Sequence, residues 1–305
     1  MAVVHATRRA WIAWAAVCVI WGTTYLAIKV ALDAIPPFLM GGLRYTSAGL
    51  IMAAVLAASG RRLPPVSHWP KIALLGLLML AVGNGGVVWG EQYLTSGLTA
   101  VILATSAFWM VAIDALLPHG DRLHRRQGVG LVVGFSGVVL LVWPEIFVGG
   151  IGARHFAIGV ASLQIACIGW GIASAYTRRH VLKDDVLGSA ALQMVFGGAA
   201  LCVVAWLTGE WHAIPWTIHA AGALAYLTLA GAVIAFAAYS YALNHMDVAT
   251  LSLYTYVNPV IAVALGIALL HEPFALRQLL AGVVILAGMA IVKSLPPPPA
   301  GESIS

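Results

Sequence analysis

Three charged side chains lie in strongly apolar stretches, where burying a charge is costly. Lys29 comes late in the first stretch, Arg44 early in the second and Glu91 at the end of the third. We expect them to meet near one membrane surface, where Glu91 would pair with Lys29 or Arg44. The remaining cation would attract a carboxylate or form a gate. Alternatively, Lys29 and Arg44 extend to the lipid headgroups while their aliphatic stems stay in lipid.

Uncharged polar residues share helix faces with these charges. Gly22, Tyr25 and Lys29 follow an i, i+3, i+7 spacing. Asn84 lies seven residues before Glu91, and glycines on both sides of Asn84 make that helix thin. We expect Asn84 to face a cavity, although packing alone would explain the glycines.

A second polar group is expected at mid-depth in the ninth apolar stretch. Tyr254 and Asn258 lie one helical turn apart, and Pro259 removes a backbone hydrogen bond. Such a segment offers hydrogen-bonding groups to a substrate, or is a structural kink satisfied by neighbouring helices. Trp21 and Trp170, each beside a glycine, are the aromatic residues that we assign to the same cavity.

The sequence contains no pattern that predicts an enzyme. It has no phosphate-binding glycine loop, nucleophile elbow or metal motif on a helix, so we expect neither catalysis nor a cofactor or metal. Asp114 and Asp247 could titrate, but nothing favours a proton-coupling role for them over that of solvated helix ends. The proton is nevertheless one candidate coupling ion for a membrane protein of this kind.

The composition of the chain indicates which kind of secondary structure holds these residues in place. Hydrophobic residues make up 61% of the 305-residue chain and charged residues 9%, whereas soluble proteins carry about 25% charged residues. Only a polytopic membrane protein fits, and its backbone must be satisfied by helices. The net charge of +5 is explained by topology and indicates no nucleic-acid partner. The three cysteines lie in apolar runs and are expected to be packing residues.

We therefore predict an all-α fold with ten transmembrane helices. Each needs roughly 20 apolar residues to cross the lipid bilayer. The expected spans are 11–32, 38–58, 70–89, 97–117, 127–143, 156–176, 187–207, 220–243, 248–270 and 275–292.

Lysine and arginine predict the orientation, because they concentrate in cytoplasmic loops. With a cytoplasmic N-terminus, twelve of the sixteen lie on that side and four on the other. Both termini are therefore expected in the cytoplasm. The cytoplasmic group comprises Arg8, Arg9, Arg61, Arg62, Lys71, Arg122, Arg125, Arg126, Arg178, Arg179, Lys183 and Lys293.

The chain also contains an internal duplication. Trp170-Gly171 lies 149 positions after Trp21-Gly22, and Arg277-Gln278 lies 151 positions after Arg126-Gln127. We predict two repeats, residues 11–143 and 156–292, followed by a disordered tail at 296–305. Because each repeat has an odd number of helices, the second enters the membrane upside down, as in many secondary transporters.

The last hairpin resembles a known family. An Asn258-Pro259 helix, a Glu272-Pro273 turn, Arg277-Gln278 and a glycine-containing last helix are similar to the second repeat of EamA-type permeases in the drug/metabolite transporter superfamily. The likeness extends over residues 11–292. In the first repeat, Phe108 stands where a proline is common, and Asp121-Arg122 where a turn beginning with Glu is common.

The resemblance implies a secondary transporter of the bacterial inner membrane. It would export small metabolites, amino acids or amphipathic drugs by alternating access around a central cavity. The alternative is an integral-membrane channel or a lipid-handling protein. The residues expected to line the cavity are Trp21, Tyr25, Lys29, Arg44, Asn84, Glu91, Trp170, Tyr254 and Asn258.

Overall fold

The computed structural model describes residues 7–117, 124–148, 150–179, 186–212, 214–246 and 248–293. All regular structure in these ranges is helical, as predicted. Asp121, Asp247 and the tail at 296–305, for which we made predictions, lie outside the described residues.

Eight helical spans are long and apolar enough to cross a membrane, and two shorter apolar helices follow them in the described part of the chain. The prediction of ten apolar helices thus corresponds to eight long and two short ones. The elements are α1 (Arg8–Leu32), α2 (Pro37–Ala58), η1 (Val66–His68), α3 (Trp69–Gly76), η2 (Leu77–Asn84), α4 (Gly85–Glu91), α5 (Ser96–Leu103), α6 (Ser106–Leu116), α7 (Arg125–Val148), α8 (Gly150–Arg179), α9 (Val186–Leu207), α10 (Ile218–Tyr226), η3 (Leu227–Ile234), α11 (Ala235–Leu243), α12 (Val248–Leu251), α13 (Tyr254–Leu270) and α14 (Leu276–Lys293).

Two expected helices are interrupted, one near its middle and the other near its start. The span predicted at 97–117 breaks at Ala104 and Thr105, between α5 and α6. The span predicted at 248–270 breaks at Ser252 and Leu253, between α12 and α13, and this break is why α13 is short. Pro259 lies inside α13, which runs without interruption from Tyr254 to Leu270.

Two other spans contain π-helical segments at matching positions. These segments are η2 (Leu77–Asn84) and η3 (Leu227–Ile234), and both their first and last residues are 150 positions apart. A π-helix shifts the backbone bonding from i−4 to i−5 and is frequent at functional sites. Both halves of the chain therefore have the same unusual backbone in their third long helix.

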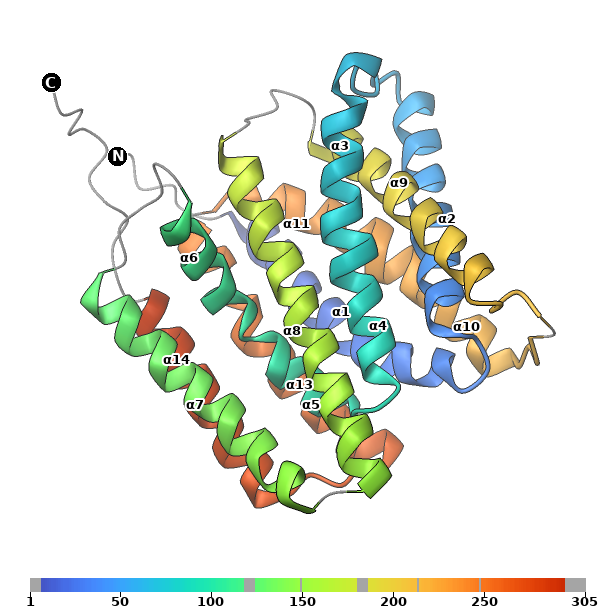
Figure 1. The fold of residues 1–305 in the computed structure, drawn as a ribbon. Helices are drawn as coiled ribbons and strands as arrows, with labels where there is room; N and C mark the ends of the chain where they lie inside the picture. The colour runs from blue at the N-terminus through green and yellow to red at the C-terminus, as the bar shows by residue number, and fades with distance from the viewer. Residues whose placement is uncertain are drawn as a thin grey trace, which may run out of the picture.

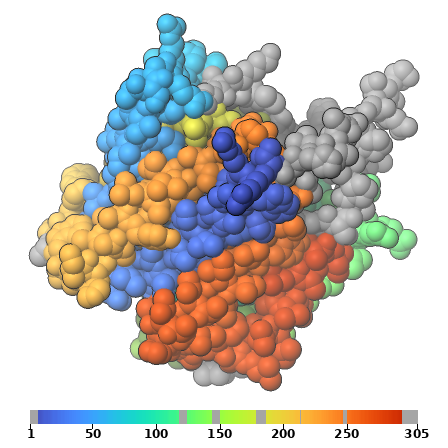
Figure 2. All heavy atoms as spheres, turned by 180° about the vertical axis from the view of Figure 1, so that it is seen from behind, coloured from blue at the N-terminus to red at the C-terminus, as the bar shows by residue number. Residues whose placement is uncertain are grey.

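Helices of each half of the chain pack against helices of the other half. In the first half, α1 packs against α13 and α11; in the second, α8 packs against α6 and against η2 with α4. The pairs α2 with α9 and α7 with α14 form opposite edges of the bundle (Figure 1). From behind, α1 lies between α10–α11 on one side and α13 on the other (Figure 2).

Glycines allow the closest of these contacts. A Cβ on Gly49 of α2 would lie 2.7 Å from the Ala191 oxygen of α9, and one on Gly137 of α7 would lie 2.9 Å from the Ala281 oxygen of α14. Small residues let membrane helices approach until their backbones touch. The apolar core lies between these edge pairs, with Phe108, Leu141 and Leu163 among its fully buried side chains.

The bundle has two ends, which we name by one residue each. The Glu272 end carries the turns at 33–36, 92–95 and 271–275, and the Asn244 end carries the turns at 59–65 and 244–246. At the Glu272 end, a Glu210 carboxylate oxygen accepts a hydrogen bond from the Leu39 backbone nitrogen at 2.8 Å. Glu210 thereby caps α2, whose own N-cap, Pro36, makes no side-chain bond.

Candidate functional site

Lys29 lies where α4 turns into α5. Its ammonium donates to the backbone oxygens of Glu91 and Leu94, at 2.8 Å each. The last carbonyls of a helix have no partner within that helix and form the negative end of its dipole. The Glu91 oxygen is one of these, and the Leu94 oxygen belongs to the turn that follows, so Lys29 places a positive charge at the end of α4 and in the turn. Its ammonium is therefore bonded to the protein backbone at this turn.

The Glu91 carboxyl group is fully buried, and neither of its oxygens has a hydrogen-bond partner. Lys29 contacts the backbone of Glu91 rather than its carboxylate, so the predicted ion pair is not formed. The charged groups that interact electrostatically with this carboxyl are Lys29, Arg44 and Glu272. Isolated buried carboxylates are costly unless they are paired and hydrogen-bonded.

Arg44 of α2 completes the charged group. Its side chain is 4% exposed, and its guanidinium carbon lies 4.7 Å from the centroid of the Tyr45 ring, a cation–π contact. The guanidinium Nε has no hydrogen-bond partner. One terminal nitrogen lies 3.3 Å from where a Cβ on Gly231 would be, so this glycine leaves room for the guanidinium. Like Lys29, Arg44 is held within the bundle.

Glu272, in the turn between α13 and α14, binds the first turn of α5. Its carboxylate accepts hydrogen bonds from the Ser96 nitrogen and the Ser96 Oγ, at 2.8 Å each, and from the Gly97 nitrogen at 3.4 Å. A carboxylate at a helix N-terminus is stabilised by the free N–H groups and by the dipole. We call this contact the Glu272 latch, because it ties the second half of the chain to the first.

The aromatic and amide residues predicted at mid-depth also come together. The Tyr254 ring lies 5.1 Å from the Trp21 ring, and Tyr239 packs against both, at 5.5 Å from Trp21 and 6.0 Å from Tyr254. With its amide oriented to suit its surroundings, Asn258 donates to the Cys18 oxygen at 3.1 Å and to the Tyr254 oxygen at 3.0 Å. Asn258 thereby ties α13 to α1.

Tyr25 stands between the charged group and this aromatic group. It lies on α1 four residues after Trp21 and four residues before Lys29, so these three side chains share one face of the helix. A row of polar and aromatic side chains therefore lies along α1. The predicted residues Trp21, Tyr25, Lys29, Arg44, Glu91, Tyr254 and Asn258 belong to it.

Trp170 and Asn84 form a separate arrangement around η2. The Trp170 indole donates to the Met79 oxygen at 2.8 Å, and the Asn84 amide donates to the same oxygen at 3.1 Å. In the other half, the Trp21 indole donates to the Gly231 oxygen of η3 at 3.1 Å. Each π-helical segment thus receives an indole hydrogen bond from a tryptophan of the opposite half.

A buried polar chain that we did not predict links α6 and α8. The Trp109 indole donates to the Gln164 Oε1 at 2.7 Å, and the Gln164 amide donates to the Thr105 Oγ1 at 3.2 Å. Thr105 is fully buried at the break between α5 and α6. The signal in the sequence was Gln164 itself, an amide within an apolar run.

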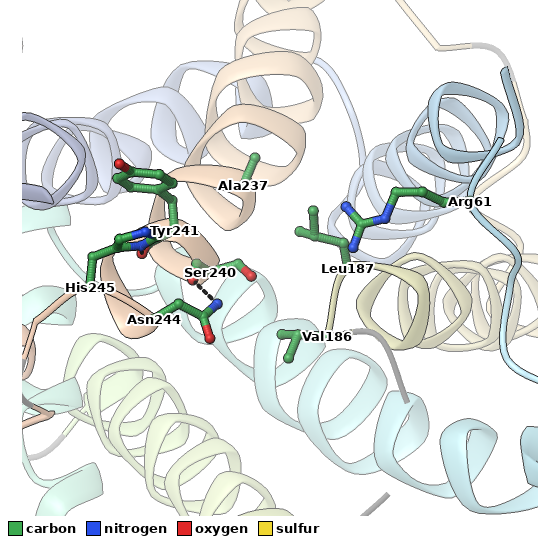
Figure 3. A pocket seen from close by; sticks show the side chains of 8 residues that line it. All are labelled: Arg61, Val186, Leu187, Ala237, Ser240, Tyr241, Asn244 and His245. Carbon is green, nitrogen blue, oxygen red and sulfur yellow. Dashed lines mark hydrogen bonds between the residues drawn. The ribbon is translucent and has the colours of Figure 1, made fainter. Parts of the chain in front are cut away.

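A hollow of about 450 Å³ opens at the Asn244 end (Figure 3). Its polar lining comes from Ser240, Tyr241, Asn244 and His245 of α11 and the turn after it, with Arg61 across the hollow. The His245 ring stacks on Tyr241 at 4.1 Å between centroids, and its Nδ1 bonds the Tyr241 oxygen at 2.8 Å. Neither Glu272 nor His245 was among the predicted cavity residues, since both lie outside the apolar runs that we searched for polar side chains.

A bundle of apolar helices whose charged, amide and aromatic side chains meet inside it is the architecture of polytopic membrane proteins that handle polar solutes. The family model for EamA-like transporters matches residues 9–143 and 157–294. The chain therefore belongs to the EamA-like transporter family and is a membrane transporter with multiple transmembrane helices, as its last hairpin had suggested.

Relatives share most of the chain. The inner membrane transporter YedA of Escherichia coli K12 is 34% identical over 275 residues, which cover 89% of this chain and 87% of YedA. The Bacillus subtilis transporter YvbV is 25% identical over 268 residues, covering 88% and 86%. One crystal structure shares the fold with a TM-score of 0.64 at 21% identity, covering 92% of this chain and 95% of its own.

Proposed function

We propose that this protein is a secondary transporter of the bacterial inner membrane that exports small metabolites, amino acids or amphipathic drugs by alternating access. The observation that carries the proposal is the exchange of packing partners between the two halves: α1 packs on α13 and α11 as α8 packs on α6 and on η2 with α4. Two similar halves that pack on each other in this way have two equivalent arrangements, open at opposite ends.

In this proposal the repeats are residues 11–143 and 156–292, inverted relative to each other, with ten membrane helices including the two short ones. Both termini are cytoplasmic, so the Asn244 end, which carries Arg61 and Arg62, faces the cytoplasm. The Glu272 end then faces the periplasm. The hollow at the Asn244 end and the latch at the Glu272 end support a conformation that is closed toward the periplasm.

The substrate cavity in this proposal is lined by the row along α1. The Arg44 Nε has no hydrogen-bond partner among the described residues, so it is available to a polar solute. The protein performs no catalysis in this scheme and needs no cofactor or metal. Trp21, Tyr254 and Asn258 supply the aromatic and amide wall at mid-depth.

The experiment uses inside-out vesicles from cells that overproduce the protein, with fluorescent ethidium and radiolabelled amino acids as probes. Saturable, gradient-dependent accumulation of a probe is expected. Lys29→Met should abolish that accumulation while folded protein remains in the membrane, because the Glu91 and Leu94 backbone oxygens lose the ammonium that binds them. Linear, unsaturable flux would instead identify a channel.

Orientation has its own test. A fluorescent protein fused after Lys293 should fluoresce, because it folds in the cytoplasm. Alkaline phosphatase fused at the same position should be inactive. The opposite pair of results would reverse the assignment of the two ends.

A further inference from the structure

Glu91 is 0% exposed, and its two carboxyl oxygens have no hydrogen-bond partner in the part of the chain that the structure describes. A buried carboxylate normally has its charge paired and its oxygens hydrogen-bonded, because the desolvation of an ion costs several kcal/mol. Neither condition is met. The two cations nearby are both engaged elsewhere: Lys29 with two backbone oxygens, and Arg44 with the face of Tyr45.

We propose that Glu91 is a proton-binding site, and that loss of its proton releases the Glu272 latch. This inference rests on the proposed function and names the coupling ion of that transporter. In the conformation described, the carboxyl group is neutral and carries the proton. When water reaches it, the proton passes to water and leaves a carboxylate.

The link between the proton and the latch is Lys29. Lys29 bonds the oxygens of Glu91 and Leu94, and Leu94 lies two residues before Ser96, the partner of Glu272. A charged Glu91 would attract the Lys29 ammonium away from the Leu94 oxygen, which unties the turn at 92–95. The Glu272 carboxylate would then be repelled by a second negative charge at Glu91.

The surroundings of Glu91 contain the charged groups that this switch needs and few other titratable groups. The titratable or charged groups that act on it are Lys29 and Tyr25 from α1, Arg44 from α2, and Glu272 from the turn after α13. Where α4 packs on α8, the nearest contacts of Gly90 are Gly159 and Leu163, neither of which titrates. From α8, Cys167 acts on Tyr25.

The first test needs no substrate. The purified protein in liposomes is studied by infrared spectroscopy for the carbonyl band of a protonated carboxyl group near neutral pH. The band should be present, absent in Glu91→Gln and retained in Asp33→Asn. Asp33 is the matched control, since it is an exposed carboxylate at the same end of the bundle. Absence of the band, or its persistence in Glu91→Gln, would overturn the proton site.

The second test follows the latch. A cysteine replaces Thr99, which is fully buried one turn after Ser96, and Cys202→Ser removes the one native cysteine that is not buried. The probe is a membrane-impermeant thiol reagent. The thiolate fraction of the cysteine itself rises with pH and accelerates labelling in every variant alike. The measured quantity is therefore the ratio of the labelling rate in the parent to that in the Glu91→Gln background at the same pH. This ratio should rise with pH, and in Asp33→Asn the rate should follow the parent.

Equal pH dependence in the parent and in Glu91→Gln would overturn the coupling to the latch. Because neither measurement uses a transported molecule, failure of the vesicle assay and failure of this inference are distinguishable. Glu91→Asp, which keeps a titratable group, should restore both the infrared band and the pH-dependent labelling. If Glu91→Asp labels at the same rate as Glu91→Gln at every pH, the residue is structural and the inference fails.

Discussion

The carboxylate of Glu272 binds both the backbone nitrogen and the hydroxyl of Ser96, each at 2.8 Å, although the residues are 176 positions apart. A hydrogen bond to a charged group contributes about 1.5–3 kcal/mol. We expect Glu272→Gln to lower the free energy of unfolding by roughly that amount and to expose Thr99→Cys at the Glu272 end. Thermal unfolding in detergent and thiol labelling would measure the two effects. Ser96→Ala keeps the backbone contact and should lose less, so a larger loss in Ser96→Ala would contradict the latch.

The two indole hydrogen bonds to the π-helical segments predict an asymmetry. Trp21→Phe leaves the Gly231 oxygen without its indole donor, whereas Trp170→Phe leaves the Met79 oxygen bonded to Asn84. A buried polar group that loses its partner costs about 1–3 kcal/mol. Trp21→Phe should therefore destabilise more than Trp170→Phe in thermal unfolding.

The control for this asymmetry is a double variant. Asn84→Ala combined with Trp170→Phe removes both donors to Met79, so the loss should exceed the sum of the two single losses. If the stability losses of the two single variants simply add, neither donor to the Met79 oxygen compensates for the loss of the other.

Apolar runs and embedded polar residues made much of this structure predictable. The helices, the pairing of Tyr254 with Trp21 and the gathering of Lys29, Arg44 and Glu91 follow from one rule, that lipid excludes polar side chains. The breaks in the fourth and ninth spans and the π-helical segments were not predictable. They depend on tertiary partners such as Trp170, which bonds to a carbonyl 91 positions away.

The partner of each charge was equally hidden. The order of the apolar helices placed Glu91 near Lys29. Whether the ammonium binds the carboxylate or a backbone oxygen depends on small differences in the geometry of the turn. Glu272 was overlooked because it stands outside the apolar runs, and only the fold brings it to Ser96.

Gly83 and Gly222 should respond oppositely to alanine. A Cβ on Gly83 would collide with the Trp170 indole, whereas one on Gly222 would meet nothing within 4 Å. Overpacking a tight contact costs typically about 1–3 kcal/mol, while Gly→Ala in a free helical position gains roughly 0.5–1 kcal/mol. Gly83→Ala should therefore lower the melting temperature, and Gly222→Ala should leave it unchanged or raise it. A tolerant Gly83→Ala would show that Trp170 can move away from η2.

Glu210 gives a prediction about pH. Partial burial raises the pKa of its carboxyl above the ordinary value, against the opposing effect of the hydrogen bonds from the backbone nitrogens of Leu39 and Phe38. The folded protein therefore binds this proton more tightly than the unfolded chain does. Its contribution to stability is fully present below the unfolded pKa and is lost as pH rises through the raised pKa.

The stability difference between the wild type and Glu210→Gln, which cannot titrate, isolates this contribution. The melting temperatures of both proteins are measured at neutral pH and near the ordinary carboxyl pKa. The difference between the two proteins should favour the wild type more at the lower pH. Glu210 is half-buried, so solvent screening keeps the change well under about 1 kcal/mol. A difference that instead grows with pH would mean that the bonds to Leu39 and Phe38 outweigh burial. In that case the cap on α2 would be strongest when Glu210 is charged, and acid would loosen the Glu272 end.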